Sequence, residues 1–149
     1  MTWPGAPTIY YGDEAGMCGW TDPDNRRAYP WTKEDRDLIL FHRDIIKIHK
    51  ENNVLKYGSM MFLYGAHKVV SYGRFSRKDK MIVILNNNYE EVQLHLSVDR
   101  LGMLNGDALT QLMLTTEEGY SMEAKTYQVE NNELFIEVPG IAAMVLKAE

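Results

Sequence analysis

Apolar side chains between positions 32 and 51 recur at intervals of three and four residues, which is the period of one face of an α-helix. The stripe consists of Leu38, Phe41, Ile45 and Ile48, and Ile39 and Ile46 widen it. Thr32 followed by Asp35 resembles a capping box, and Asn52-Asn53 interrupts the pattern, so we predict a helix from 32 to 51. Because the stripe is wide, we expect neighbours on more than one side of this helix.

The chain from Leu55 onward consists of short apolar and β-branched runs separated by turn residues. The predicted strands cover Lys56 to Tyr64, Val69 to Phe75, Met81 to Leu85, Val92 to Leu96, Leu109 to Leu114, Thr126 to Val129, Leu134 to Val138 and Ala142 to Leu146. Turn signals lie at Ser76 to Asp79, Asn86 to Asn88, Asn131-Asn132 and Pro139-Gly140. Closely spaced strands without intervening helices favour an antiparallel β-sandwich. We therefore predict a mainly β fold preceded by one long α-helix.

Residues 1 to 31 show neither a helical nor a strand-rich pattern. Four prolines interrupt any helix in this segment, namely Pro4, Pro7, Pro23 and Pro30. Only the run Thr8 to Tyr11 reads as a strand, and Gly12 ends it. One short strand and a long loop cannot form a core alone, so this region needs other elements to pack against.

Composition restricts the possible partners. The formal net charge of -5 leaves no excess of Lys and Arg to neutralise phosphates, so we do not expect nucleic acid as a partner. No stretch approaches about 18 continuous apolar residues and the first residues lack an apolar leader, so we expect neither membrane insertion nor a targeting segment. The single cysteine, Cys18, excludes an internal disulfide and leaves the compartment open, with the cytoplasm favoured.

The most specific motif lies near the beginning of the chain. Residues 5 to 16 read GAPTIYYGDEAG, and residues 22 to 26 read DPDNR. This pair of motifs resembles the segment around the eighth barrel strand of the α-amylase family, glycoside hydrolase family 13. The resemblance is stronger to its neopullulanase, cyclomaltodextrinase and maltogenic amylase branch, and the predicted helix and β-rich region follow in the family's order.

The resemblance implies two domains. Residues 1-51 would be a remnant of a (β/α)8 barrel, made of strand 8, a substrate loop and helix 8, and residues 52-149 would be the C-terminal antiparallel β-sandwich. In such a barrel the loops at the C-terminal ends of the strands build the active site, so the segment from Gly12 to Tyr29 would lie at the substrate mouth.

Asp22 and Arg26 are the candidate substrate-binding residues. A carboxylate and a guanidinium can exchange hydrogen bonds with vicinal sugar hydroxyls, and Trp20, Tyr29 and Trp31 offer flat apolar faces to a pyranose ring. In the family, the Asp and Arg of this motif line the glycone side of the cleft. The alternative is a local structural role, in which Asp22 to Asp24 forms a turn and Arg26 pairs with Asp24.

No catalytic residue is assigned. Asp13 and Glu14 are adjacent and point in different directions, whereas a retaining glycosidase needs two carboxyls about 5 to 5.5 Å apart across the scissile bond. The family's catalytic carboxylates lie on earlier barrel strands, and no position of this sequence matches their motifs. The four histidines, Cys18 and the carboxylates lack the spacing of a metal site, so we expect no metal and no cofactor.

We therefore interpret the chain as the C-terminal portion of a retaining α-glucan-active glycoside hydrolase that is inactive in isolation. Its expected ligand is an α-glucan oligosaccharide bound in the intact enzyme. One alternative is a stand-alone carbohydrate-binding β-sandwich that uses Tyr57, Tyr64, Tyr72 and Tyr89. A purely structural task for residues 52 to 149 is compatible with either interpretation. The strand at Thr8 to Tyr11 and the wide helical stripe also predict self-association.

Overall fold

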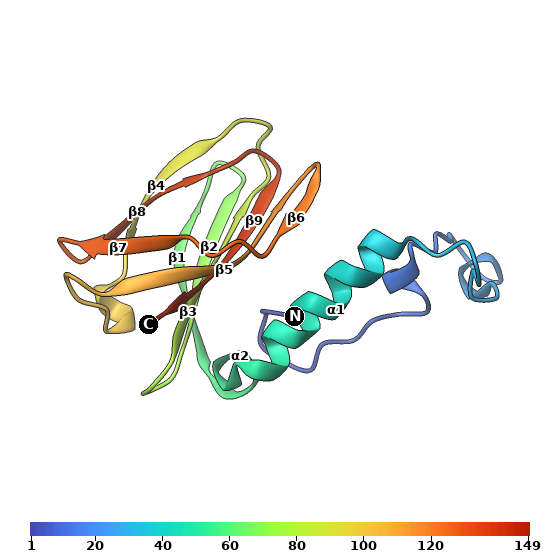
Figure 1. Ribbon diagram of the computed structural model, residues 1–149, viewed down its shortest axis with the longest axis horizontal. Helices are drawn as coiled ribbons and strands as arrows, with labels where there is room; N and C mark the ends of the chain where they lie inside the picture. Colours follow the sequence, from blue (N-terminus) through green and yellow to red (C-terminus); the bar gives the residue numbers. More distant parts are fainter.

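The structure is a computed structural model that describes residues 1–149. It consists of a β domain, a long helix that lies beside it, and an irregular loop region at the far end of that helix (Figure 1). The helices are α1 (Arg36–Glu51) and α2 (Asn53–Tyr57), with single 3-10 turns at Asp13–Ala15, Asp24–Arg26 and Asp99–Leu101. Neither α-helix combines the length and apolarity needed to cross a bilayer.

Nine strands make up the β domain, and every pairing between them is antiparallel. They are β1 (Ser59–Ala66), β2 (Val69–Phe75), β3 (Lys80–Asn86), β4 (Val92–Ser97), β5 (Ala108–Thr116), β6 (Gly119–Ser121), β7 (Thr126–Glu130), β8 (Glu133–Val138) and β9 (Ala142–Ala148). The strand order is β1-β2-β3-β9-β5-β7-β8-β4, and β6 pairs with β5. The predicted fold class, an antiparallel β-sandwich preceded by one long helix, is confirmed.

Strand β7 joins the two layers of the sandwich because it pairs with both. Gln128 faces Ala108 of β5, whereas Val129 faces Leu134 of β8. Between the layers lies the main core, which includes Ile82 and Leu146 from one layer and Leu134 from the other. These side chains are fully buried, and burial of one such side chain stabilises a fold by about 1.5–3 kcal/mol.

The C-terminal half of helix α1 packs on the outer face of β3, β9 and β5. Ile45 and Ile48 of the helix pack against Met81, Met113 and Val145, which form a second buried cluster with residues of α2. In β3 the neighbouring residues of the run 81 to 84 therefore point alternately to the helix and to the main core, and all four are buried. A strand buried on both faces explains why this run is continuously apolar.

The helix begins later than predicted. It starts at Arg36, and Asp35 is its N-cap, because Oδ1 of Asp35 accepts a hydrogen bond from the backbone N–H of Leu38 at 3.0 Å. Thr32 lies outside the helix with a φ of 70°. The predicted capping box from Thr32 to Asp35 is therefore wrong, since Asp35 itself performs the capping.

The predicted strand at Thr8 to Tyr11 is also absent. This segment is irregular and turns sharply, because the N–H of Asp13 donates to the carbonyl of Tyr10 at 2.9 Å. A strand needs a neighbouring strand for its backbone groups, and none of the nine strands pairs with this segment. The segment that the resemblance assigns to barrel strand 8 is therefore irregular here.

The first residues are nevertheless fixed to the β domain. Arg74 is buried on β2, and its Nη1 and Nη2 donate to the carbonyls of Thr2 and Gly58 at 2.7 and 2.9 Å. The hydroxyls of Thr2 and Tyr72 are 2.7 Å apart, and the ring of Trp3 packs edge-on against that of Tyr72. Tyr72, which the sequence suggested as an exposed sugar-binding tyrosine, is therefore buried beneath the N-terminal segment.

Candidate functional site

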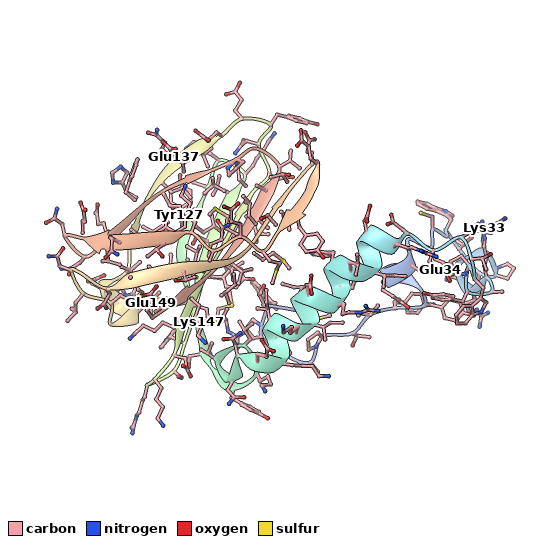
Figure 2. All side chains as sticks on the ribbon, viewed as in Figure 1. Lys33, Glu34, Tyr127, Glu137, Lys147 and Glu149 are labelled. Atoms are coloured by element: carbon pink, nitrogen blue, oxygen red, sulfur yellow. The ribbon has the colours of Figure 1, made fainter.

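The predicted substrate loop is anchored at the N-terminus of α1. The turn Asp13–Ala15 lies between Gly12 and Gly16, both of which have positive φ values that glycine adopts without strain. Ala15 is buried, and its carbonyl accepts a hydrogen bond from the N–H of Asp35 at 3.2 Å. Both ends of the loop therefore meet at the helix start. The rest of the loop, up to Lys33 and Glu34, lies at the end of the molecule remote from the sheets (Figure 2).

Asp22 and Arg26 lie together in this loop. Nε of Arg26 is 3.0 Å from Oδ1 of Asp22, and a terminal guanidinium nitrogen of Arg26 donates to Oδ2 at 3.0 Å. The 3-10 turn Asp24–Arg26 produces this two-pronged pair by bringing the side chains four residues apart onto one side. Both side chains remain more than half exposed, at 64% for Asp22 and 59% for Arg26, so their outer hydrogen-bonding edges are open to a ligand.

A second ion pair occupies the neighbouring residues. Nε of Arg27 donates to Oδ1 of Asp24 at 2.8 Å, and a terminal nitrogen of Arg27 contacts the same oxygen. The hydrogen bond that Arg27 donates to Asp24 raises the pKa of Arg27. Asp24 is thus engaged by Arg27 and not by Arg26, so the structural alternative that paired Arg26 with Asp24 has the wrong partner.

Three aromatic side chains accompany the Asp22–Arg26 pair in the loop. The rings of Tyr29 and Trp31 are in contact, with centroids 4.7 Å apart, whereas Trp20 stands apart and is 88% exposed. Burial, followed by the nearby carboxylates Glu14 and Glu34, raises the pKa of Tyr29. The structure therefore joins Tyr29 to Trp31 but does not bring Trp20 to them.

Asp13 and Glu14 do not form a catalytic pair. Oδ2 of Asp13 accepts a hydrogen bond from the backbone N–H of Tyr10 at 3.2 Å, so this carboxylate stabilises the turn that follows Tyr11. Glu14 lies in the same 3-10 turn and contributes to the electrostatic environment of Tyr29. Among His, Cys, Asp and Glu, no group of three or more is arranged to hold a metal ion.

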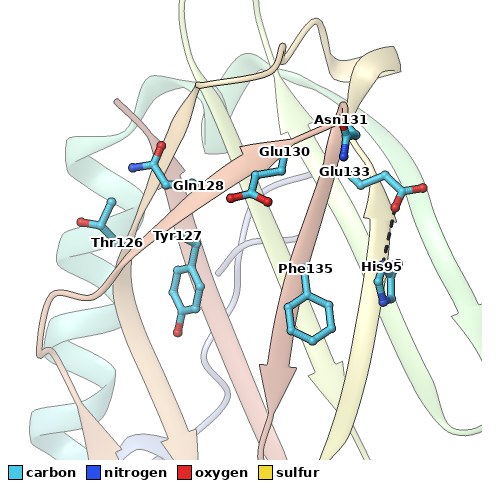
Figure 3. Close-up of a pocket in the computed structure, with 8 residues that line it drawn as sticks. All are labelled: His95, Thr126, Tyr127, Gln128, Glu130, Asn131, Glu133 and Phe135. Carbon is cyan, nitrogen blue, oxygen red and sulfur yellow. Dashed lines mark ion pairs between the residues drawn. The ribbon is translucent and has the colours of Figure 1, made fainter.

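A hollow on the β domain was not predicted from the sequence. It has a volume of about 530 Å³ and lies against β7, β8 and β4 (Figure 3). Its lining residues are His95, Thr126, Tyr127, Gln128, Glu130, Asn131, Glu133 and Phe135. One signal could have located it: Phe135 occupies an outward position of β8 between the outward Glu133 and Glu137, and is half exposed. We call this cavity the β7–β8 hollow.

Comparison with known proteins adds sequence relatives. No protein-family model matches the chain. The amylopullulanase of Thermoanaerobacter thermohydrosulfuricus is 33% identical over 156 aligned residues, which cover 98% of this chain and 10% of that protein. The cyclomaltodextrinase of Thermoanaerobacter pseudethanolicus is 40% identical over 99 residues, which cover 65% of this chain and 17% of that protein. The chain thus spans only a small part of the length of these relatives.

Solved structures share the whole fold. An α-amylase from Geobacillus thermoleovorans, solved in complex with acarbose, superposes with a TM-score of 0.85 at 24% identity, covering 99% of this chain and 31% of that one. The debranching enzyme of Nostoc punctiforme gives a TM-score of 0.74 at 26% identity, covering 97% and 28%.

Together the helix, the β-sandwich and the preceding loop define the class of the chain, which is the carboxyl-terminal helix and β domain of an α-amylase-like protein. The chain belongs to the α-amylase family, glycoside hydrolase family 13, and corresponds to a C-terminal portion of such proteins.

Proposed function

We propose that this chain is the C-terminal portion of a retaining α-glucan-active glycoside hydrolase of the α-amylase, neopullulanase or cyclomaltodextrinase type. Relatives named amylopullulanase, cyclomaltodextrinase and neopullulanase support this proposal, because all three names denote proteins that act on α-glucans. In the intact protein the chain contributes a substrate loop and a structural β domain. The observation that carries the proposal is the exposed, two-pronged pair of Asp22 and Arg26 in a loop anchored at the helix start.

The Asp22–Arg26 pair is suited to bind a sugar. Each partner fixes the orientation of the other, so their free edges present an acceptor and a donor at a set spacing. A pyranose with adjacent hydroxyls can donate to Asp22 and accept from Arg26 at once. The exposed face of Trp31, held by Tyr29, offers an apolar surface for the ring.

The catalytic step belongs to residues outside this chain. Retaining hydrolysis through a covalent glycosyl intermediate requires a nucleophile and an acid/base on opposite flanks of the bond, about 5 to 5.5 Å apart. Asp13 accepts a hydrogen bond from the backbone of Tyr10, and both oxygens of the Asp22 carboxylate contact the Arg26 guanidinium. We therefore expect the isolated chain to bind α-glucan oligosaccharides weakly and to leave them uncut.

We propose a structural role for residues 52-149 and a barrel origin for residues 1-51. A buried cluster supports these two roles, because it holds α1 against the sheet. In it Ile45 and Ile48 pack against Met81, Met113 and Val145. The position of the substrate loop depends on the position of α1, to which it is joined. The β domain therefore acts as a base that orients α1 and, through Asp35, the substrate loop.

Self-association of the chain is a further part of the proposal. The exposed side of α1 and the segment before it carry apolar surface, including Leu40, Tyr10 and Tyr11, each about half exposed. Ile39 and Ile46 line a shallow groove beside Ile9 and Tyr11. Apolar surface of this kind favours association between copies. Multi-angle light scattering should show a dimer at micromolar concentration, and a strictly monomeric chain would remove this part of the proposal.

Two observations test the proposal as a whole. The first is an assay of the highly purified chain on maltotriose, for which we expect no product. Turnover that follows the protein through chromatography would show that the catalytic carboxylates lie within these residues. The second is the reading frame upstream of the codon for Met1, where we expect an in-frame stretch that encodes earlier barrel strands.

A further inference from the structure

The β7–β8 hollow arises where two strands separate. Strands β7 and β8 share only two register pairs, Val129 with Leu134 and Glu130 with Glu133. Beyond them β7 turns away to β5, so Gln128 pairs with Ala108 instead of continuing along β8. The hollow occupies the gap, with Thr126 to Glu130 on one side and Phe135 and His95 on the other (Figure 3). It is therefore produced by the topology of the sandwich itself.

The floor of the hollow on the β8 side is aromatic. His95 of β4 and Phe135 of β8 are register partners, and their rings are tilted with centroids 4.9 Å apart. Nδ1 of His95 lies 3.5 Å from a carboxylate oxygen of Glu133, which orients the imidazole beside the phenyl ring. Phe135 is 50% exposed, and Figure 3 shows its ring on β8 beside His95 in the lining of the hollow. It therefore offers a fixed apolar plane to a ligand.

The other walls are rich in hydrogen-bond acceptors. Glu130 and Glu133 supply carboxylates, and Gln128 and Asn131 supply amides that both accept and donate. Tyr127 closes one end, where its hydroxyl donates to Oε1 of Gln111 at 3.3 Å and the ammonium of Lys125 lies 5.2 Å from its ring centre. One face of Tyr127 is thus covered, and Phe135 is the open aromatic surface of the hollow.

This lining selects a class of ligand. Two carboxylates, with neither lysine nor arginine among the lining residues, repel phosphates and carboxylates. A flat apolar plane surrounded by acceptors instead fits a neutral molecule that has an apolar face and a rim of hydroxyl donors. A pyranose ring has both properties, and 530 Å³ is the size of cavity that holds a small ligand of a few rings.

We propose that the β7–β8 hollow is a second, non-catalytic binding site for α-glucan chains, with Phe135 as its stacking platform and Gln128, Glu130 and Glu133 as its hydrogen-bonding wall. The choice of an α-glucan over another sugar rests on the proposed function. Figure 2 shows Tyr127 and Glu137 on the β domain, far from Lys33 and Glu34 beside the substrate loop. The hollow therefore holds a polysaccharide at a distance from the substrate loop. Such binding raises the local concentration of the polysaccharide at that loop.

Titration of the ¹⁵N-labelled full chain with maltoheptaose, followed by NMR, tests this site. We expect saturable shifts of the side-chain amides of Gln128 and Asn131 and of the backbone amide of Phe135 at millimolar sugar. Phe135→Ala should weaken binding at these signals by about tenfold or more, because the stacking plane is lost. Tyr57→Ala, which removes an aromatic side chain that is even more exposed and lies outside the hollow at the end of α2, is the control and should leave the affinity unchanged.

The substrate loop is tested in the same titration, which separates the two proposals. In Arg26→Ala the shifts in the hollow should persist, since the two sites are independent. Shifts confined to Trp20, Asp22 and Arg26 would overturn the second site and leave the proposed function standing. Absence of shifts in the hollow, or equal weakening by Phe135→Ala and Tyr57→Ala, would also overturn it. Shifts in the hollow alone would support this site and count against the loop.

Discussion

The hydroxyl of Tyr120 donates a hydrogen bond of 2.8 Å to Oδ2 of Asp44, which joins strand β6 to the middle of helix α1. This bond and, secondarily, burial raise the pKa of Tyr120 above its ordinary value of 10.0. Phe41 packs edge-on against the same tyrosine ring from one turn before Asp44. The contact links α1, which carries the proposed substrate loop, to the β5–β6 hairpin of the β domain.

Tyr120→Phe should lower the free energy of unfolding by about 1 kcal/mol at neutral pH, because it removes a hydrogen bond to a charged group at a partly exposed site. A tyrosine with a raised folded-state pKa contributes stability that is complete below pH 10 and is lost as the pH rises through the folded value. The difference between wild type and variant should therefore shrink above pH 10. Urea unfolding at neutral pH and above pH 10 measures this difference. The control Tyr57→Phe, which removes an exposed hydroxyl without a partner, should leave the free energy of unfolding unchanged.

Arg74→Met should destabilise the chain by about 2–4 kcal/mol. The buried guanidinium donates hydrogen bonds to the carbonyls of both Thr2 and Gly58. Burial lowers the pKa of Arg74. Methionine fills similar space but leaves those carbonyls unpaired. Chemical denaturation gives the magnitude, with the exposed Arg77→Met as control. Equal stability of the two variants would show that the N-terminal segment is not fixed by Arg74.

Adjacent residues of β8 should respond very differently to truncation. Leu134 is fully buried between the layers, so Leu134→Ala should cost about 2–5 kcal/mol through lost burial and a residual cavity. Phe135 points outward, so Phe135→Ala should cost less than about 1 kcal/mol. Thermal unfolding of both variants measures the contrast. A large loss for Phe135→Ala would mean that the ring supports the fold and is unsuited to serve as an open stacking plane.

Gly140 lies in the turn between β8 and β9, where its backbone touches that of Tyr89. A Cβ at this position would overlap the carbonyl oxygen of Tyr89, and backbone cannot move aside as a flexible side chain can. Gly140→Ala should therefore destabilise the domain by about 1–3 kcal/mol. Gly65→Ala on β1, where a Cβ meets open space, is the matched control and should change the unfolding midpoint little.

Much of the fold could be predicted because its signals are local. Strand β2 was predicted at its observed bounds, since an apolar run lies between turn residues. Helix α2 was missed because its five residues continue an apolar pattern that also suits a strand, and only packing of Val54 and Leu55 against the sheet decides between them. The strand at Thr8 to Tyr11 was wrong because a strand depends on neighbours, which a local pattern does not reveal.

In the candidate site, too, local features could be predicted from the sequence, and features that depend on the assembled fold could not. Asp22 and Arg26 could be named from their motif, but the choice of partners could not, since Arg26 and Arg27 each lie within reach of two carboxylates and the 3-10 turn decides between them. The β7–β8 hollow depends on the residue at which β7 leaves β8. Such a position is a property of the assembled sheets, so the sequence offered only the outward Phe135 as a sign.

A chimera tests the central proposal most directly. The segment of the Thermoanaerobacter thermohydrosulfuricus amylopullulanase that aligns with this chain, at 33% identity, would be replaced by residues 1–149, and kcat/KM would be measured on pullulan. We predict that the chimera hydrolyses pullulan, that Arg26→Ala lowers its kcat/KM by about a hundredfold, and that Arg27→Ala leaves it within about twofold. A folded chimera in which Arg26→Ala is as active as Arg27→Ala would contradict a substrate-binding role for Asp22 and Arg26.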